Sequence, residues 1–379
     1  MSEGAPASPN ASSKTAPRTE SETRLYQDIL KQPAQLAASL SHMIGTGRPA
    51  LQEAAALLRG TRPLVITGIG ASWHAGMAMQ AELLSRGRVG LLIDASELLH
   101  SAEVPQNAIV VLLSRSGKST EIVQLIDKCR ASSATILSIT NDPQSPLALG
   151  SDVVLNTHTD FDHAVSVTTY SAIALAGVLL VREANGSSIQ SVQDELSQPL
   201  VDSAKAIPEW RRIIEASGWL GDSGFTYFLA RGASLASCHE SRLLWEEAAK
   251  RPATALTSGG FRHGPQEIVR DGMRAGIWLD ADQMRVQDMD LARDLRSLGA
   301  RVLLVGQRVD ENAADCILQL PVIPARWQFL IDIIPIQIAA ERLAVLLREN
   351  PDSFRLCSYI VEDEGGLGRP PKQQTEERN

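Results

Sequence analysis

The chain has 379 residues, of which 44% are hydrophobic and 21% are charged, and its formal net charge is −8. This composition is that of a globular protein, and the length is enough for two domains. The acidic balance, without any run of lysine or arginine, argues against a nucleic-acid-binding surface but not against a phosphorylated metabolite.

The sequence begins with a polar leader. Residues 1–20 are rich in Ser, Ala and Pro and lack the apolar core of a signal peptide, so we expect them to be disordered. Apolar residues at helical spacing follow from about residue 21. Pro33 interrupts this pattern, which predicts two short helices rather than one.

Short apolar runs then alternate with helical segments. We expect strands at 64–67, 89–94, 109–113, 135–140 and 152–156, and helices at 74–86, 119–131 and 168–183. Strands separated by helices of this length are typical of a parallel, doubly wound sheet.

The same pattern restarts after about residue 205. We expect strands at 227–230, 275–280, 301–306 and 317–321, and helices at 238–250 and 327–347. Residues 66–76 and 229–239 both run from a strand through Gly-Ala-Ser into a helix, which is a weak internal repeat. The predicted fold is α/β, with two similar doubly wound parallel-sheet lobes of the flavodoxin-like three-layer α/β/α type. The lobes are expected at 21–200 and 201–350, and a C-terminal segment with a flexible tail at 351–379.

A serine-rich turn is the most informative part of the sequence. It follows an apolar strand and precedes a helix, so its backbone amides are expected to face an anion at the helix N-terminus. The turn also contains three hydroxyl donors, Ser114, Ser116 and Ser119. Gly117 permits the tight turn, and Arg115 and Lys118 could add positive charge. Serine is also a common helix cap, which is the plainer interpretation. Three serines and a glycine at the end of a buried strand favour a phosphate site, although not a Walker loop, because GxxxxGK[ST] is absent.

A second glycine-rich turn, GIGAS, lies at 68–72. The Gly-x-Gly pattern also begins dinucleotide-binding turns, but the sixth position here is Trp73 rather than glycine. The acid expected after the next strand is ambiguous at Asp94. We therefore favour a sugar-contacting turn in which Ser72 is a hydrogen-bond donor.

Acid–base candidates lie in the second half of the chain. Within 239–250, Glu240 and Glu247 are seven residues apart and share one helix face, whereas Glu246 points elsewhere. A carboxylate beside a ligand could move a proton on carbon next to a carbonyl, although the pattern alone is more typical of a solvated face. His263 lies in a loop flanked by Gly and Pro, where it is either available for acid–base chemistry or merely exposed.

Five segments together resemble the sugar isomerase (SIS) family, especially the isomerase half of glucosamine-6-phosphate synthase (glutamine–fructose-6-phosphate aminotransferase) and the related single-module deaminases and deglycases. The resemblance covers about residues 22–362. The segments are YQDILKQPAQL (26–36), GIGASWHAG (68–76), LLSRSGKSTEI (112–122), RGASLASCHESRLLWEE (231–247) and GGFRHGP (259–265).

This resemblance implies how a ligand is bound. In that family the serine-rich turn holds the sugar phosphate, which implies phosphate contacts for Ser114, Arg115, Ser116 and Ser119. Ser72 falls at a hydroxyl position of the first glycine turn, and the partner hydroxyl position is Ala71 here. Val165 falls where the family lines the sugar pocket with backbone.

The resemblance also implies the catalytic groups. Glu247 falls on the family's glutamate base, which moves a proton between C1 and C2 of the sugar. His263 falls on the histidine that assists ring opening and reaches the site from the neighbouring subunit. This implies a homodimer with a shared site.

Two departures from the family concern lysines. The synthase has a lysine one turn before the base, where this chain has Leu244, and a C-terminal lysine that aligns with Tyr359. The chain also lacks an N-terminal cysteine and a glutaminase domain, so glutamine is not expected as the ammonia source within it.

The cysteines and the lack of a long apolar stretch indicate the cellular compartment and the partners to expect. The cysteines show neither CxxC spacing nor a neighbouring histidine cluster, which predicts reduced thiols and neither a metal site nor a disulfide framework. No apolar stretch reaches the length of a membrane span. We therefore expect a cytoplasmic protein with no cofactor and no membrane or nucleic-acid partner. The cysteines are Cys129, Cys238, Cys316 and Cys357.

Two functions remain open from the sequence. The first is an enzyme acting on an amino- or keto-hexose 6-phosphate, preferably deaminating glucosamine 6-phosphate to fructose 6-phosphate. Deglycation of a fructosamine 6-phosphate and the aminotransferase–isomerase half-reaction are its nearest variants. The alternative is a non-catalytic sugar-phosphate sensor, which the missing lysines favour and the presence of Glu247 and His263 disfavours.

Overall fold

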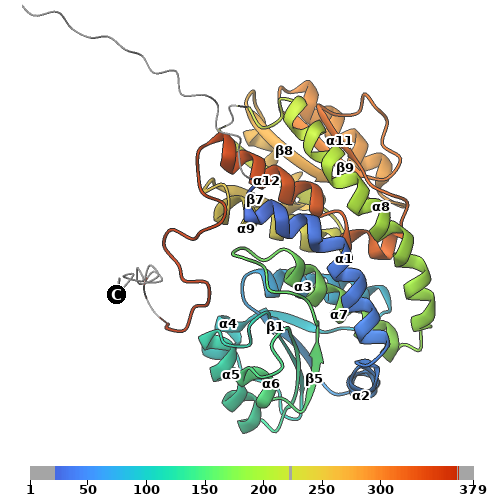
Figure 1. Cartoon of the computed structure of the whole chain (residues 1–379), viewed down its shortest axis with the longest axis vertical. Coiled ribbons are helices and arrows are strands. Elements are labelled where there is room, and N and C mark those ends of the chain that lie inside the picture. Colours follow the sequence, from blue (N-terminus) through green and yellow to red (C-terminus); the bar gives the residue numbers. More distant parts are fainter. Residues whose placement is uncertain (1–21, 222–223, 365, 367–379) are drawn as a thin grey trace, which may run out of the picture.

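The computed structural model describes residues 22–221, 224–364 and 366. The predicted leader at 1–20 and the end of the predicted tail from 367 lie outside the described residues. Within the described part, the chain forms two α/β lobes joined through a layer of helices (Figure 1).

The first helix, α1 (Arg24–Ile44), packs against helices of both lobes, whereas α2 (Arg48–Leu58) packs against the first lobe. The predicted break at Pro33 is wrong, because α1 is continuous through it. A proline inside a helix removes one backbone hydrogen bond. Here the buried side chains of Ile29 and Leu36, on either side of the proline, hold the helix in place.

The first lobe contains a five-stranded parallel sheet in the order β2-β1-β3-β4-β5. Its three central strands are apolar runs buried on both faces, as expected when helices cover both sides of a parallel sheet, whereas the edge strands β2 and β5 are only partly buried. The strands are β1 (Leu64–Gly68), β2 (Leu91–Asp94), β3 (Ile109–Ser114), β4 (Thr135–Thr140) and β5 (Val153–Asn156), and the helices are α3 (Ala71–Ser85), α4 (Ala95–His100), α5 (Thr120–Ala131), α6 (Pro146–Leu149) and α7 (Thr168–Ala184).

The second lobe repeats this topology, with the parallel order β10-β9-β8-β6-β7. The predicted fold class is therefore confirmed. The strands are β6 (Phe225–Ala230), β7 (Ala253–Thr257), β8 (Met273–Trp278), β9 (Arg301–Gly306) and β10 (Cys316–Gln319), and the helices are α8 (Ile189–Ala216), α9 (Ser234–Glu247), α10 (Ser258–Phe261), α11 (Arg285–Ser297) and α12 (Ile334–Leu346), with 3₁₀ turns η1 (Pro265–Ile268) and η2 (Ala325–Leu330).

Two details of the second lobe differ from the expectations. The helix predicted at 327–347 is divided, because η2 ends at Leu330 and α12 begins only at Ile334. Pro335 has no amide hydrogen and suits the first turn of a helix, so it marks this new start. The expected lobe boundary after residue 200 falls inside α8, which packs against α1, α12 and β10.

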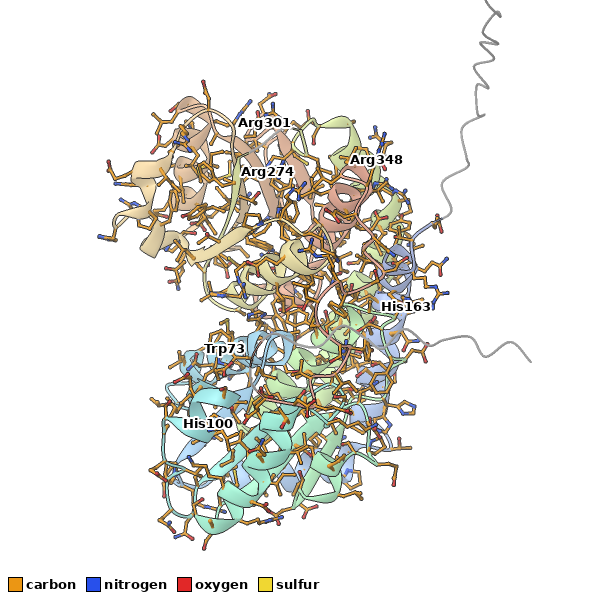
Figure 2. The ribbon with its side chains drawn as sticks, turned by 90° about the vertical axis from the view of Figure 1, so that its left-hand side faces the viewer. Trp73, His100, His163, Arg274, Arg301 and Arg348 are labelled. Carbon is orange, nitrogen blue, oxygen red and sulfur yellow. The ribbon has the colours of Figure 1, made fainter. Side chains whose placement is uncertain are left out.

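The lobes meet where α3 of the first packs against α9 of the second. Figure 2 shows Trp73, from the start of α3, at the level where the two lobes adjoin. After α12 the chain returns along the first lobe (Figure 1). There the Thr120 amide donates to the Val361 carbonyl at 3.1 Å, which places this C-terminal segment at the N-terminus of α5. No helix in the described ranges has the length and apolar character needed to cross a membrane.

Candidate active site

The strand order of the first lobe places two turns side by side. From β1 the chain moves to one side of the sheet, to β2, and from β3 it continues to the other side, to β4. The crevice between the carboxyl ends of β1 and β3 is thus the switch point at which open α/β sheets bind ligands. The turns at 68–72 and 114–119 both open onto this point.

The serine-rich turn is held by hydrogen bonds from its own amides. The Gly117 amide donates to Oγ of Ser114 at 3.0 Å, and the Lys118 amide donates to Oγ of Ser116 at 3.3 Å. Both serines are buried. Their oxygens accept these bonds, whereas their O–H groups donate to no described residue and stay available for a ligand.

Gly117 is required by this geometry. Its φ is +62°, in the left-handed region that glycine adopts without steric cost. A Cβ atom here would lie 2.1 Å from Oγ of Ser145, so the turn also packs closely against the segment before α6.

Ser119 does not act as the helix cap that the plainer interpretation would require. It is the N-cap residue of α5, but its side chain accepts no capping hydrogen bond. Its hydroxyl is therefore free to join those of Ser114 and Ser116. Ser119 therefore occupies the N-cap position without the side-chain hydrogen bond that usually accompanies it.

The two cations of the turn are engaged elsewhere. Arg115 donates to the Ala164 carbonyl, to Oγ of Ser166 and to the Tyr359 carbonyl, and its guanidinium lies 4.1 Å from the centre of the Tyr359 ring. Nζ of Lys118 lies 2.8 Å from the Asp142 carboxylate, and this contact is the main reason that the pKa of Asp142 is lowered. Arg115 thus joins the turn to the C-terminal segment, and its phosphate contact stays a prediction.

The other predicted sugar contacts lie around the same crevice. Ser72, in the first turn of α3, is buried, and its hydroxyl has no hydrogen-bond partner among the described residues. Val165 is buried in the loop before α7, which Asp162 organises by accepting hydrogen bonds from the amides of Val167 and Thr168. These amides at the N-terminus of α7 are thereby occupied within the chain.

Glu247 ends α9 and faces the first lobe. Burial, followed by the charge of Glu240, raises its pKa to about 8, while the charge of Arg115 lowers it. Its charge in turn contributes to raising the pKa of Cys357 in the C-terminal segment. The carboxyl group therefore lies within electrostatic reach of both the Arg115 end of the serine-rich turn and the C-terminal segment.

A buried pair next to Glu247 was not predicted. Oε2 of Glu240 lies 2.8 Å from Nδ1 of His74 on α3, and both side chains are almost fully buried. Burial is the largest cause in both groups: it raises the pKa of Glu240 to about 8 and lowers that of His74 to about 3. Burial thus disfavours charge on both groups, which favours a protonated carboxyl of Glu240 that donates to a neutral imidazole. The sequence pattern favoured a solvent-exposed helix face, and this interpretation is wrong for Glu240, which is buried.

These buried carboxyl groups make stability depend on pH. Burial also raises the pKa of Asp332 to about 7, so three carboxyls hold protons in the folded chain that the unfolded chain releases near pH 4. Their contribution is lost as pH rises through 7 to 8. The lowered pKa of His74 acts in the opposite direction, but only below about pH 6.5. We expect the free energy of unfolding in urea to fall by on the order of 3 kcal/mol between pH 6.5 and 9.

In the Glu240→Gln variant the free energy of unfolding should fall less over the same pH range, because one of the three carboxyls is absent. Glu53→Gln, at an exposed position on α2, serves as the control and should retain the full pH dependence. Stability that stays constant or increases between pH 6.5 and 9 would contradict the burial of these carboxyls.

His263 is exposed in the loop between α10 and η1. No described hydrogen bond or ion pair connects its side chain with Glu247. Within one chain the structure therefore does not bring the two predicted catalytic groups together.

The two positions that depart from the family differ in their surroundings. Leu244, on α9, is fully buried in the apolar core. Tyr359 donates from its hydroxyl to the Asp162 carbonyl at 2.7 Å and packs on Arg115. The leucine therefore has a packing role, while the tyrosine fixes the C-terminal segment beside the crevice.

Comparison with known proteins identifies a matching family and similar sequences. Residues 57–182 match the SIS domain family. The chain is 24% identical over 347 residues to glutamine–fructose-6-phosphate aminotransferase (isomerizing) of Pyrococcus horikoshii, covering 89% of this chain. It spans only 57% of the length of that relative.

Solved structures share the fold. The C-terminal domain of glucosamine-fructose-6-phosphate aminotransferase from Francisella tularensis superposes with a TM-score of 0.78 at 20% identity, covering 89% of this chain and 100% of that one. Glucosamine-6-phosphate deaminase from Thermotoga maritima superposes with a TM-score of 0.76 at 22% identity, covering 89% of this chain and 99% of that one.

Proposed function

We propose that this chain, whose residues 57–182 match the SIS domain family, is an enzyme that isomerises and deaminates an amino-hexose 6-phosphate. The preferred reaction converts glucosamine 6-phosphate and water into fructose 6-phosphate and ammonia. Deglycation of a fructosamine 6-phosphate is the nearest variant. The similarity to amino-sugar enzymes supports the substrate class, and the site geometry supports the chemistry.

One observation carries the proposal. Ser72, Ser114, Ser116 and Ser119 surround the switch point, and none of their hydroxyl groups donates to another described residue. Hydroxyl donors at the N-terminus of α5 are suited to a phosphate, because the helix dipole adds to their attraction for an anion. The phosphate of the sugar would displace the Val361 carbonyl from the Thr120 amide, or bind beside it.

The proposed chemistry requires one base. After ring opening, the carboxylate of Glu247 removes the proton from C2, which carries the amino group, and an enolamine forms. The same proton is returned to C1, so that C2 becomes an imine. Water adds to this imine and ammonia leaves, giving the 2-ketone of fructose 6-phosphate. A pKa near 8 suits a group that must both accept and return a proton near neutral pH.

The assay that tests the proposal follows ammonia and fructose 6-phosphate during incubation with glucosamine 6-phosphate. We expect the two products in equal amounts. A fructosamine 6-phosphate substrate should be examined in parallel. Tight binding of these compounds without turnover of any of them would instead identify a sugar-phosphate sensor.

We further propose that a second copy of this chain completes the site with its His263. His263 is exposed, and within one chain no described hydrogen bond or ion pair joins it to Glu247, which supports this arrangement. Mixed dimers of Glu247→Gln and His263→Asn chains would then contain one site with both native groups. Unfolding and refolding an equal mixture of the two inactive variants should restore about a quarter of the wild-type activity, since half of the dimers are mixed and each has one intact site. An inactive mixture that nonetheless forms dimers would show that both groups act within one chain.

A further inference from the structure

A cavity lies in the second lobe, away from the crevice described above. It has a volume of about 920 Å³, within the range of small-molecule sites. It is located at the amino ends of β6 and β8, where Thr226 pairs with Arg274, and it is closed by the carboxyl ends of α8 and α12. Figure 2 shows Arg274 and Arg348 in the second lobe, well separated from Trp73 between the lobes.

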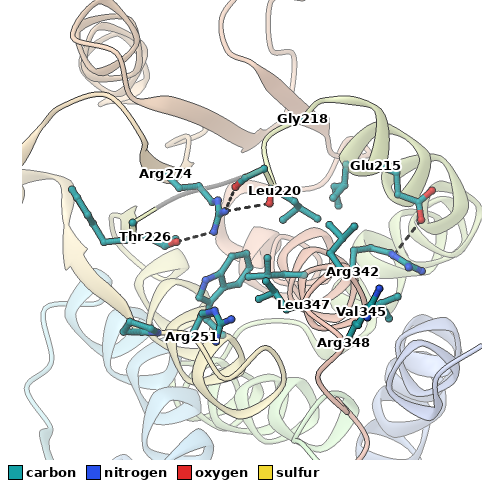
Figure 3. Close-up of a pocket in the computed structure, with 18 residues that line it drawn as sticks. Glu215, Gly218, Leu220, Thr226, Arg251, Arg274, Arg342, Val345, Leu347 and Arg348 are labelled. Atoms are coloured by element: carbon teal, nitrogen blue, oxygen red, sulfur yellow. Dashed lines mark hydrogen bonds and ion pairs between the residues drawn. The ribbon is translucent and has the colours of Figure 1, made fainter.

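The cavity is basic although the chain is acidic. Its described lining contains four arginines and one glutamate, a net charge of +3, against −8 for the whole chain. Figure 3 shows the arginines entering from different sides of the cavity. They are Arg251, Arg274, Arg342 and Arg348, and the glutamate is Glu215, which pairs with Arg342.

Arg274 contributes a buried positive charge. Its guanidinium donates to the carbonyls of Trp219, Leu220 and Gly221 and to Oγ1 of Thr226. It contacts no carboxylate among the described residues. Burial, followed by the charge of Arg301, lowers its pKa to about 10, so it remains charged at neutral pH. This charge makes an anion in the cavity favourable even though four of its five N–H groups already donate within the chain.

Other donors remain available to a ligand. The Arg348 side chain is exposed and makes no hydrogen bond or ion pair within the described ranges. The Arg251 side chain is half-exposed and lies 3.9 Å from Glu349, beside Arg348, so its pairing is loose. Nε1 of Trp245, in the wall of the cavity, is buried without an acceptor among the described residues.

Neutralisation of helix dipoles does not explain all of this charge. The carboxyl ends of α8 and α12 border the cavity, and each carries about half a negative charge. Together they offset about one positive charge of the three, and Glu349, which lies 3.9 Å from Arg251 outside the lining, offsets part of another. The remaining positive charge would attract an anion, and the apolar side chains of Leu346 and Leu347 would contact a less polar body attached to that anion.

We propose that this cavity binds a phosphorylated metabolite of up to nucleotide size, with its phosphate between Arg251 and Arg348 and its body along Leu347. A phosphate carries close to two charges and three acceptor oxygens, enough for two guanidinium groups. This site is independent of the reaction proposed above, because the serine-rich turn contributes nothing to it.

Isothermal titration of the full chain with inorganic pyrophosphate tests the proposal. We expect binding that persists in the Ser114→Ala/Ser116→Ala variant, which removes hydroxyls from the other phosphate site. Each of Arg251→Gln and Arg348→Gln should weaken binding about tenfold, since each removes a charged donor. Arg130→Gln, on α5 of the first lobe, is the control and should leave the affinity unchanged.

Three results would overturn the proposal: no binding of pyrophosphate, binding that is lost in the double serine variant, or an affinity that the two cavity arginines do not affect. Turnover of glucosamine 6-phosphate is measured separately, so its failure would not be confused with any of these results.

Discussion

Replacing Glu247 by glutamine is expected to lower kcat/KM for glucosamine 6-phosphate by about 10²- to 10⁴-fold, the contribution typical of a general base. Glutamine has nearly the same shape but cannot accept the proton from C2. The variant should fold as well as the wild type above neutral pH, because burial disfavours the charged carboxylate that it replaces. Sugar-phosphate binding, measured by calorimetry, should be retained.

Glu246→Gln is the matched control for this variant. Glu246 lies next to the base but pairs with Arg242 at 2.5 Å, so its loss should leave kcat/KM close to the wild-type value. In the wild type, kcat/KM should rise with pH up to about 8, because Glu247 acts as a base only after it loses its proton. Equal activity of the Glu247→Gln variant and the wild type would exclude Glu247 as the base.

Gly117→Ala is expected to weaken hexose 6-phosphate binding by at least about tenfold, because the serine-rich turn must then move to make room. The added Cβ would lie 2.1 Å from Oγ of Ser145, and the left-handed φ of +62° adds about 1–2 kcal/mol of strain for alanine. Titration calorimetry measures the affinity, and urea unfolding measures the stability.

The Gly186→Ala variant is the control that shows the effect of backbone strain without the steric clash expected at Gly117. Gly186, just after α7, has a φ of +73°, but an added Cβ there meets nothing within 4 Å. This variant should lose about 1–2 kcal/mol of stability from the backbone alone and bind hexose 6-phosphate normally. If the two variants bound the sugar phosphate equally well, the turn at Gly117 would not form the phosphate site.

The local features of the first lobe could be predicted from the sequence. Each strand there is a short apolar run, and the serine-rich turn follows β3 directly, so strand, turn and helix are read from adjacent residues. The strand missing from the prediction, β7, lacks this signal. β7, with the sequence ATALT, is only partly buried and contains small residues, and it was not expected as a strand.

Features that depend on distant partners could not be predicted. His74 and Glu240 are 166 positions apart and meet only because α3 packs on α9. The interior prolines of α1 and α8 suggest breaks locally, but burial of the surrounding apolar residues keeps both helices continuous. The basic cavity likewise collects arginines from α9, β8 and α12 or the segments that follow them, without any motif in the sequence.

Hydrogen exchange of the serine-rich turn tests the central claim most directly. Glucose 6-phosphate, fructose 6-phosphate and glucosamine 6-phosphate should each slow amide exchange at 116–120, whereas unphosphorylated glucosamine at the same concentration should not. Unchanged exchange at these amides, under conditions where calorimetry shows the phosphorylated sugars bound, would place their phosphate elsewhere and contradict this account.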